Sequence, residues 1–126
     1  MLKQLTLTNF RRIENDTMNF SEGLNVIRGD NEASKTTRIE SILYAFFGSK
    51  GLREPLAKVV TYDKPENSLK VELGFTYDGV DYHIKRGKSG AELTYGDQSV
   101  TGQTEVRVFC ERLFGCSADT AKQLVI

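Results

Sequence analysis

The residues best suited to chemistry lie together in one polar segment, residues 29–37, of sequence Gly-Asp-Asn-Glu-Ala-Ser-Lys-Thr-Thr. The segment contains Lys35, whose ammonium can reach phosphate oxygens, and Thr36, whose hydroxyl can bind Mg²⁺. Gly29 precedes them at the spacing typical of a phosphate-binding loop. We therefore predict a phosphate site here, with Thr36 as the Mg²⁺ ligand.

Ser34 departs from the pattern G-x-x-x-x-G-K-[ST], because it stands where the second glycine is expected. A side chain at that position costs about 1–2 kcal/mol if the backbone is left-handed, and its Cβ crowds a bound phosphate. We therefore expect a Ser34→Gly variant to bind nucleotide more tightly. Two alternatives remain open: the loop relaxes and accepts serine, or the segment is a polar turn that only caps a helix.

A phosphate-binding loop needs a strand before it and a helix after it, so that backbone N–H groups at the helix start face the anion. The apolar run 24–27 predicts the buried strand. From Lys35 onward apolar residues recur at helical spacing, and Gly48 predicts the end of the helix. The apolar stripe consists of Ile39, Ile42, Leu43, Phe46 and Phe47.

The remaining sequence predicts antiparallel strands and a final helix. Asp78-Gly79 between two alternating runs is a strong hairpin signal. The expected elements are a strand at 2–8, a loop at 49–68 with a short helix near 53–60, a β-meander at 69–101 and a helix at 103–114. The predicted fold class is mixed α/β.

Composition limits the possible classes of protein. The chain has 126 residues, which fits one domain, and 17 basic and 17 acidic side chains give a formal net charge of zero. Bulk charge therefore gives no sign of nucleic-acid binding. The two cysteines form neither a disulfide framework nor a metal knuckle. Because no apolar run approaches 18 residues, we expect a cytoplasmic protein without a membrane partner.

The order of the motifs resembles the opening of SbcC-type ATPases of DNA double-strand-break repair, which belong with the SMC and RecF proteins among ABC-type ATPases. The resemblance rests on Asn-Phe-Arg-Arg at 9–12, Ser-Glu-Gly-Leu-Asn-Val-Ile at 21–27, residues 29–37 and Ile-Glu-Ser-Ile at 39–42, and it extends over the meander and the last helix. It implies a P-loop NTPase fold. Residues 1–126 would be the N-terminal lobe of an ATPase head, with the coiled coil and the C-terminal half of the head outside this sequence.

The resemblance also implies a reaction and its partners. ATP and Mg²⁺ would be bound between two heads, and ATP binding and hydrolysis would be coupled to DNA binding and processing by a partner exonuclease. The implied partners are the C-terminal half of the same head, a second head in a homodimer, an SbcD-like nuclease subunit and DNA. Carried over to this sequence, the cofactor-binding residues are Arg11, Arg12, Gly29, Asn31, Glu32, Ala33, Ser34, Lys35, Thr36 and Thr37.

No catalytic residue is expected within these 126 residues, because the sequence has neither a Leu-Ser-Gly-Gly-like segment nor an apolar strand that ends in Asp-Glu. Hydrolysis would need the other half of the head and a second head. The main alternative is a non-hydrolysing structural or interaction domain whose site is lost through Ser34. A stand-alone P-loop kinase is a third possibility, but the acceptor and lid motifs of such kinases are missing.

Several other side chains have simpler explanations. His83 alternates with apolar neighbours and is expected on the solvated face of a strand, and Cys110 is expected in the core. Basic residues form two groups that either meet DNA, as in the resembling family, or are merely solvated. The groups are Lys50, Arg53, Lys58 and Lys64, and Lys85, Arg86 and Lys88.

Overall fold

The computed structural model describes residues 2–19, 32–52 and 54–115, without the side chains of residues 32–36. Six antiparallel strands form one sheet in the order β2-β1-β3-β4-β5-β6. The strands are β1 (Leu2–Phe10), β2 (Ile13–Asn19), β3 (Lys70–Tyr77), β4 (Val80–Gly87), β5 (Gly90–Tyr95) and β6 (Gln98–Thr101). The helices are α1 (Glu32–Phe47), α2 (Leu56–Val59) and α3 (Gln103–Phe114), with 3₁₀ turns at Gly48–Gly51 and Glu66–Ser68.

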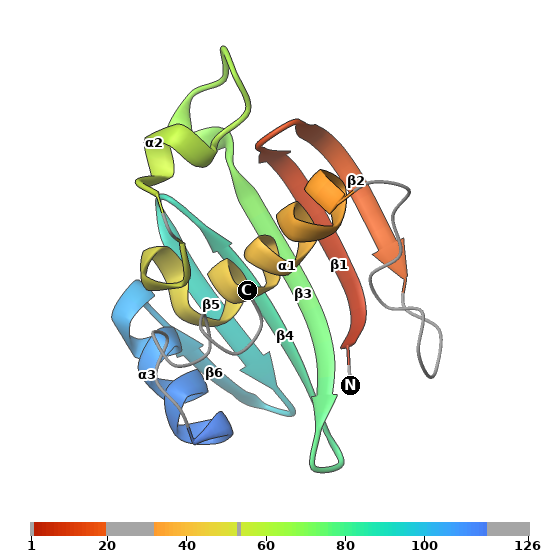
Figure 1. Cartoon of the computed structure of the whole chain (residues 1–126). Coiled ribbons are helices and arrows are strands. Elements are labelled where there is room, and N and C mark those ends of the chain that lie inside the picture. The colour runs from red at the N-terminus through yellow and green to blue at the C-terminus, as the bar shows by residue number, and fades with distance from the viewer. Residues whose placement is uncertain (1, 20–31, 53, 116–126) are drawn as a thin grey trace.

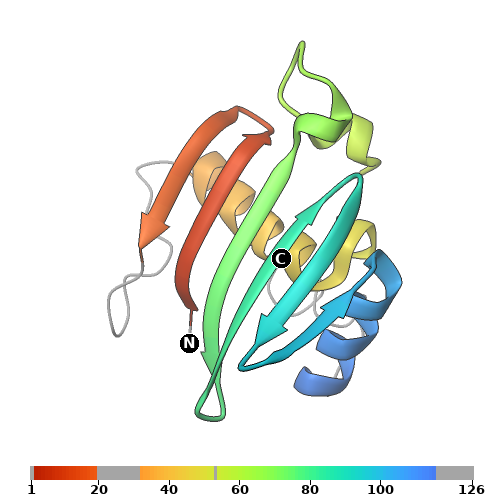
Figure 2. The same cartoon turned by 180° about the vertical axis from the view of Figure 1, so that it is seen from behind.

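The long helices cover a single face of the sheet. In Figure 1, α1 crosses β1 and β3 diagonally and α3 lies over β5 and β6, whereas Figure 2 shows the opposite face with the helices behind it. The core between these layers is apolar. Its fully buried side chains include Leu5, Leu7, Phe10, Leu69, Val71, Leu73, Ile84, Leu93 and Val106.

The meander is confirmed, including its first turn. Asp78 and Gly79 join β3 to β4 with φ angles of 52° and 81°, and positive values at both positions are what a type I′ hairpin turn requires. Tyr77 and Val80, expected on the apolar face, are 40% and 39% exposed. They flank this turn at the end of the sheet, where the described helices do not cover them fully.

Helix α1 ends at Phe47, as Gly48 predicted, and Gly48 has a φ of 69°. The apolar stripe predicted for this helix does face the core, since Leu43 and Phe47 are buried and the other members pack against the core. Tyr44 and Ala45 are buried against the sheet, whereas Ile42 and Phe46 are only partly buried. Apolar spacing thus found the buried side of the helix but underestimated its width, because Tyr44 and Ala45 beside the stripe are buried as well.

The expectations for the segment between α1 and β3 and for the last helix are also confirmed. The short helix near 53–60 is α2, and α3 ends at Gly115, whose φ is 72°. Cys110 is fully buried and His83 lies between buried neighbours on the opposite face of β4. The strand predicted at 24–27 lies outside the described residues.

Arg86 is the largest buried side chain, with 2% of its surface exposed. Its guanidinium donates from Nε to the carbonyl of Ala45 at 3.0 Å and from Nη1 to Oε1 of Gln103 at 2.6 Å, with a longer contact to the carbonyl of Phe46. Arg86 therefore satisfies carbonyls at the C-terminal end of α1, which have no partners within the helix. Through Gln103 it also ties that end to the start of α3.

Candidate nucleotide site

The predicted phosphate loop is described only in part. Gly29 and Asn31 lie outside the described residues, and so do the side chains of Lys35 and Thr36. Helix α1 begins at Glu32, so the backbone of residues 32–37 belongs to its first turns, whereas the apolar period placed the helix start at Lys35. The period could not locate this start, because the apolar stripe begins only at Ile39. The roles assigned to Glu32, Ala33, Ser34, Lys35 and Thr36 remain predictions.

A cleft of about 970 Å³ opens beside the start of α1. Thr37 from α1 and Arg11 and Arg12 from the turn between β1 and β2 line it together. The opposite wall comes from the segment around α2, with Glu54, Ala57, Lys58, Val60, Thr61, Tyr62, Asp63 and Lys64. The structure thus brings Arg11 and Arg12 together with Thr37, a predicted site residue 25 positions further along the chain than Arg12.

The turn that carries Arg11 is tight and strained. Phe10 pairs with Ile13, so Arg11 and Arg12 alone connect β1 to β2. Arg11 has a φ of 52°, a left-handed conformation that non-glycine residues adopt at a cost of about 1–2 kcal/mol. A strained residue at the edge of a cleft is a reasonable starting point for a functional hypothesis.

Two carboxylates hold the Arg11 side chain. Glu40 of α1 accepts from Nε at 2.6 Å and from Nη2 at 2.9 Å, and Glu54 accepts from Nη2 at 2.7 Å. These two acidic partners, Glu40 first, raise the pKa of Arg11 above its ordinary value. The hydrogen bond from Arg11 in turn holds the pKa of Glu54 below its usual value. Arg11 therefore carries its charge at neutral pH.

Backbone hydrogen bonds fix the wall of the cleft to the same turn. The N–H of Arg11 donates to the carbonyl of Val59 at 2.6 Å, and the N–H of Thr61 donates to the carbonyl of Asn9 at 3.0 Å. Between them Phe10 and Val60 form an isolated antiparallel bridge. Arg11 and residues 59–61 consequently hold a fixed position relative to each other.

Size and charge of the cleft fit a phosphorylated ligand. Small-molecule sites commonly measure about 300–1,000 Å³, and this cleft falls in that range. Its lining includes the cations Arg11, Arg12, Lys58 and Lys64 against the anions Glu54 and Asp63. Tyr62 is 92% exposed on its wall and presents an aromatic ring to which a base could bind.

Within the described ranges, no group of three or more histidine, cysteine or acidic side chains could hold a metal ion.

The second basic group does not form the surface that was expected. Lys85 and Lys88 are exposed and paired with Glu72 and Glu66, at 3.7 and 3.4 Å, but Arg86 is buried. Both alternatives considered for this group, a DNA-facing patch and a solvated run, are therefore wrong for Arg86. Its register with Tyr82 and Ile84 explains why, since side chains two positions apart lie on the same face of a strand.

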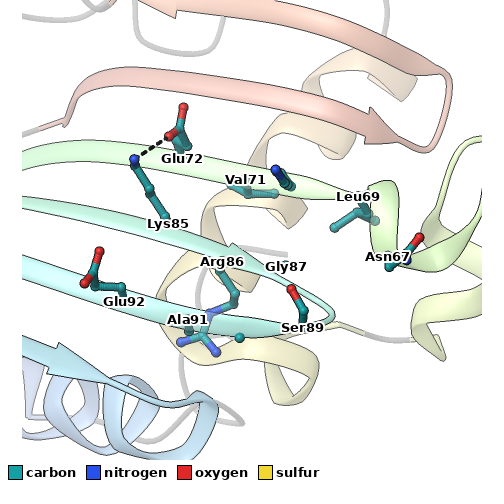
Figure 3. A pocket seen from close by; sticks show the side chains of 12 residues that line it. Asn67, Leu69, Val71, Glu72, Lys85, Arg86, Gly87, Ser89, Ala91 and Glu92 are labelled. Carbon is teal, nitrogen blue, oxygen red and sulfur yellow. Dashed lines mark ion pairs between the residues drawn. The ribbon is translucent and has the colours of Figure 1, made fainter.

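The outer face of the sheet has a separate hollow, of about 340 Å³, between β3, β4 and β5. Figure 3 shows Glu72 and Lys85 facing each other across it, with Glu92 nearby. Charges of both signs line this hollow and neutralise one another. We therefore assign no anion site to it.

Sequence reasoning missed the acidic partners of Arg11. Glu40 is a charged residue, 5% exposed, on a helix side that otherwise carries buried side chains such as Tyr44. A buried glutamate needs a cationic partner, so its place among helical core positions was a usable signal. Nothing in the sequence pairs Glu54 with Arg11, because the two are 43 positions apart.

In the part of the chain that the structure describes, no helix has the length and apolar character needed to cross a membrane.

Comparisons with known proteins show the family to which the chain belongs. A family model described as "AAA domain" matches residues 4–120. The DNA double-strand break repair Rad50 ATPase of Archaeoglobus fulgidus is 33% identical over 112 residues, which are 89% of this chain and 12% of that protein. The Rad50 ATPase of Methanocaldococcus jannaschii is 32% identical over 97 residues, 74% of this chain and 9% of that protein.

RecF proteins are similar as well. The DNA replication and repair protein RecF of Geobacillus kaustophilus is 54% identical over 41 residues, 32% of this chain and 11% of that protein. A structure of the recombination mediator protein RecF with ATP superimposes with a TM-score of 0.59 at 19% identity, over 83% of this chain and 29% of that one. This chain thus spans about a tenth of the length of the Rad50 relatives. It belongs to the AAA domain family, among the ABC-type ATPase heads of the SMC, RecF and Rad50 kind.

Proposed function

We propose that this chain binds ATP and Mg²⁺ as part of an ATPase that couples nucleotide binding and hydrolysis to DNA binding, and to DNA processing by an exonuclease partner. The cleft at the start of α1 carries this proposal, because Arg11 and Arg12 of the β1–β2 turn meet Thr37 of α1 there. The phosphates would lie against residues 29–37, with Lys35 neutralising the β- and γ-phosphates. Thr36 would bind Mg²⁺, which supplies charge neutralisation of the phosphates.

Residues of the cleft wall would contribute to the same ligand. Arg11 would face the phosphates, since its Nη1 lies outside the ion pairs that Glu40 and Glu54 make with Nε and Nη2. Tyr62 offers an exposed ring to the base. These contacts bind and orient the nucleotide. We assign hydrolysis to groups contributed by a second head and by the rest of this head, in a cytoplasmic homodimer with an SbcD-like nuclease subunit.

Calorimetric titration of the protein with ATP and Mg²⁺ tests the proposal. We expect binding that requires Mg²⁺ and that is lost in a Lys35→Ala variant. A Lys50→Ala variant is the matched control, because it removes the same charge from an exposed position outside the cleft. Absence of binding by the folded wild type, or equal affinity in the Lys35→Ala variant, would overturn the proposal.

The presence of Ser34 favours a second candidate, a structural or interaction domain that no longer binds nucleotide. Titration of wild type and Ser34→Gly separates the two functions. Binding by both forms, tighter in the glycine variant, supports a working site that serine weakens. Binding by the glycine variant alone supports the interaction domain.

A further inference from the structure

We propose that Arg11 is shared between two carboxylates with opposite roles. Glu40 positions the guanidinium for the nucleotide, whereas Glu54 is a competing partner that the incoming phosphates displace. This inference rests on the proposed function and concerns how the same site is regulated. It assigns roles to two glutamates that the phosphate-loop pattern does not include.

Glu40 has the features of a fixed support. Its side chain is 6% exposed, and both of its carboxylate oxygens accept from Arg11, at 2.6 and 2.9 Å. A two-point contact of this kind fixes the plane of a guanidinium as well as its position. Glu40 does not line the cleft, so its charge is screened from a ligand there by Arg11 itself. The contact can therefore persist when the cleft is occupied.

Glu54 has the features of an exchangeable partner. Its side chain is 44% exposed, it lines the cleft, and it makes a single contact with Arg11, at 2.7 Å to Nη2. An exposed ion pair is weak, because water solvates both partners when they separate. A nucleotide phosphate brings more negative charge to the same guanidinium than one carboxylate does. Glu54 is thus the partner that a phosphate can replace.

The backbone makes this sharing selective. Arg11 is held in a left-handed conformation by the two-residue turn and by its N–H bond to the carbonyl of Val59. The backbone of Arg11 is consequently fixed, and only the contacts of its guanidinium can change. Loss of Glu54 frees donors that remain aimed at the cleft, whereas loss of Glu40 lets the guanidinium turn away. The two substitutions should therefore change affinity in opposite directions.

The test compares glutamate-to-glutamine variants in the protein by calorimetric titration with ATP and Mg²⁺. Glu54→Gln should bind ATP about three- to fivefold more tightly, the effect of freeing one exposed ion pair. Glu40→Gln should bind about tenfold more weakly. Glu72→Gln is the control, because Glu72 is also half-exposed and paired with a single cation, Lys85, but lies on the outer face of the sheet. Its affinity should equal that of wild type.

Adenosine, measured as a competitor of ATP, provides a second measurement. Its affinity should be the same in wild type and in Glu54→Gln, since it carries no phosphate to compete with the carboxylate. Equal or weaker ATP binding by Glu54→Gln, or equal tightening by Glu72→Gln, would overturn the inference while leaving the proposed function intact. If Glu40→Gln does not fold, as judged by circular dichroism, the result for Glu54→Gln decides alone. A folded wild type that binds no ATP would instead refute the proposed function, and this inference with it.

Discussion

Helix α1 meets two arginines, one on the side of the cleft and one at its C-terminal end, and they are held in different ways. On the side of the cleft, which we call the Arg11 end, Arg11 is bound by Glu40 in the middle of the helix and by Glu54 outside it. At the other end, Arg86 is buried and bonded to backbone carbonyls and to the side-chain oxygen of Gln103. No carboxylate among the described residues accepts a hydrogen bond from Arg86.

This difference separates a structural arginine from an adaptable one. Burial lowers the pKa of Arg86 to about 10, which still leaves it charged at neutral pH, and its donors satisfy carbonyls that water cannot reach. Such an arginine cannot change partners without leaving backbone groups unpaired. Arg11 can exchange an exposed carboxylate for another anion, because Glu54 can then be solvated. The donor is an arginine at both places, and the type of acceptor distinguishes them.

The largest expected effect comes from breaking the Arg86 end. Arg86→Ala should lower the free energy of unfolding by about 3 kcal/mol, because it removes several charged hydrogen bonds and leaves buried carbonyls unpaired. Urea denaturation measures this loss. Lys85→Ala, at the neighbouring exposed position, should change stability by less than about 0.5 kcal/mol. Equal stability of the two variants would mean that Arg86 does not hold the end of α1.

Removal of the Arg11 side chain should lower the free energy of unfolding less than removal of Arg86 does, and it should lower ATP affinity more. Arg11→Ala leaves the buried Glu40 without its partner, and we expect a loss of about 2 kcal/mol, between the values for exposed and buried pairs. ATP affinity should fall about tenfold, as for removal of a charged contact to phosphate. Under conditions in which both variants are folded, calorimetry should show weaker ATP binding for Arg11→Ala than for Arg86→Ala. The reverse order would remove the distinction between the two ends.

The smallest effect is a difference in pH dependence. Burial raises the pKa of the Cys110 thiol, near Arg86, to about 12 from an ordinary value of 9.0. Between these values the unfolded thiol loses its proton and the folded one keeps it, so stability falls as pH rises, by about 1 kcal/mol at pH 10. Denaturation of wild type and Cys110→Ala from pH 8 to 10 should show a steeper decline in wild type. Parallel curves would contradict the assignment.

The Arg11 end should respond to pH in the opposite direction. Because Arg11 holds the pKa of Glu54 below its usual value, this ion pair stabilises the protein above the pKa of the unfolded glutamate. The contribution is lost as the pH falls through the lower, folded pKa. Acid thus weakens the end near the cleft, and alkali weakens the buried end.

Local sequence signals predicted the elements well. Asp78-Gly79 supplied the positive φ angles of a hairpin, and Gly48 ended α1 with a φ of 69°. These signals work because glycine has no Cβ to clash at positive φ, and aspartate tolerates positive φ through local hydrogen bonds of its short side chain. The order of the strands is different in kind, since β1 lies between β2 and β3. Leu2 pairs with Phe75 and Thr8 pairs with Lys70, so the paired residues are 73 and 62 positions apart along the chain. Such pairing depends on contacts that no short window contains.

Sequence motifs pointed to some residues that line the cleft, whereas other residues take part only through tertiary contacts that no motif encodes. Arg11, Arg12 and Thr37 were named from the family resemblance, and the structure places all three on one cleft, whereas their role in binding nucleotide remains a prediction. Arg86 was misassigned, because clustering with Lys85 and Lys88 was given more weight than its period-two register with Ile84. Glu54 could not have been found, since its partnership with Arg11 arises only from tertiary packing.

The bridge between Phe10 and Val60 has a consequence for the entropy of binding. Its flanking hydrogen bonds, from Arg11 to Val59 and from Thr61 to Asn9, join the two sides of the cleft before any ligand is present. The ordering entropy of this wall is therefore lost during folding and does not weaken association. A ligand that enters meets a preorganised surface there, whose shape was set by the pairing of two short backbone segments.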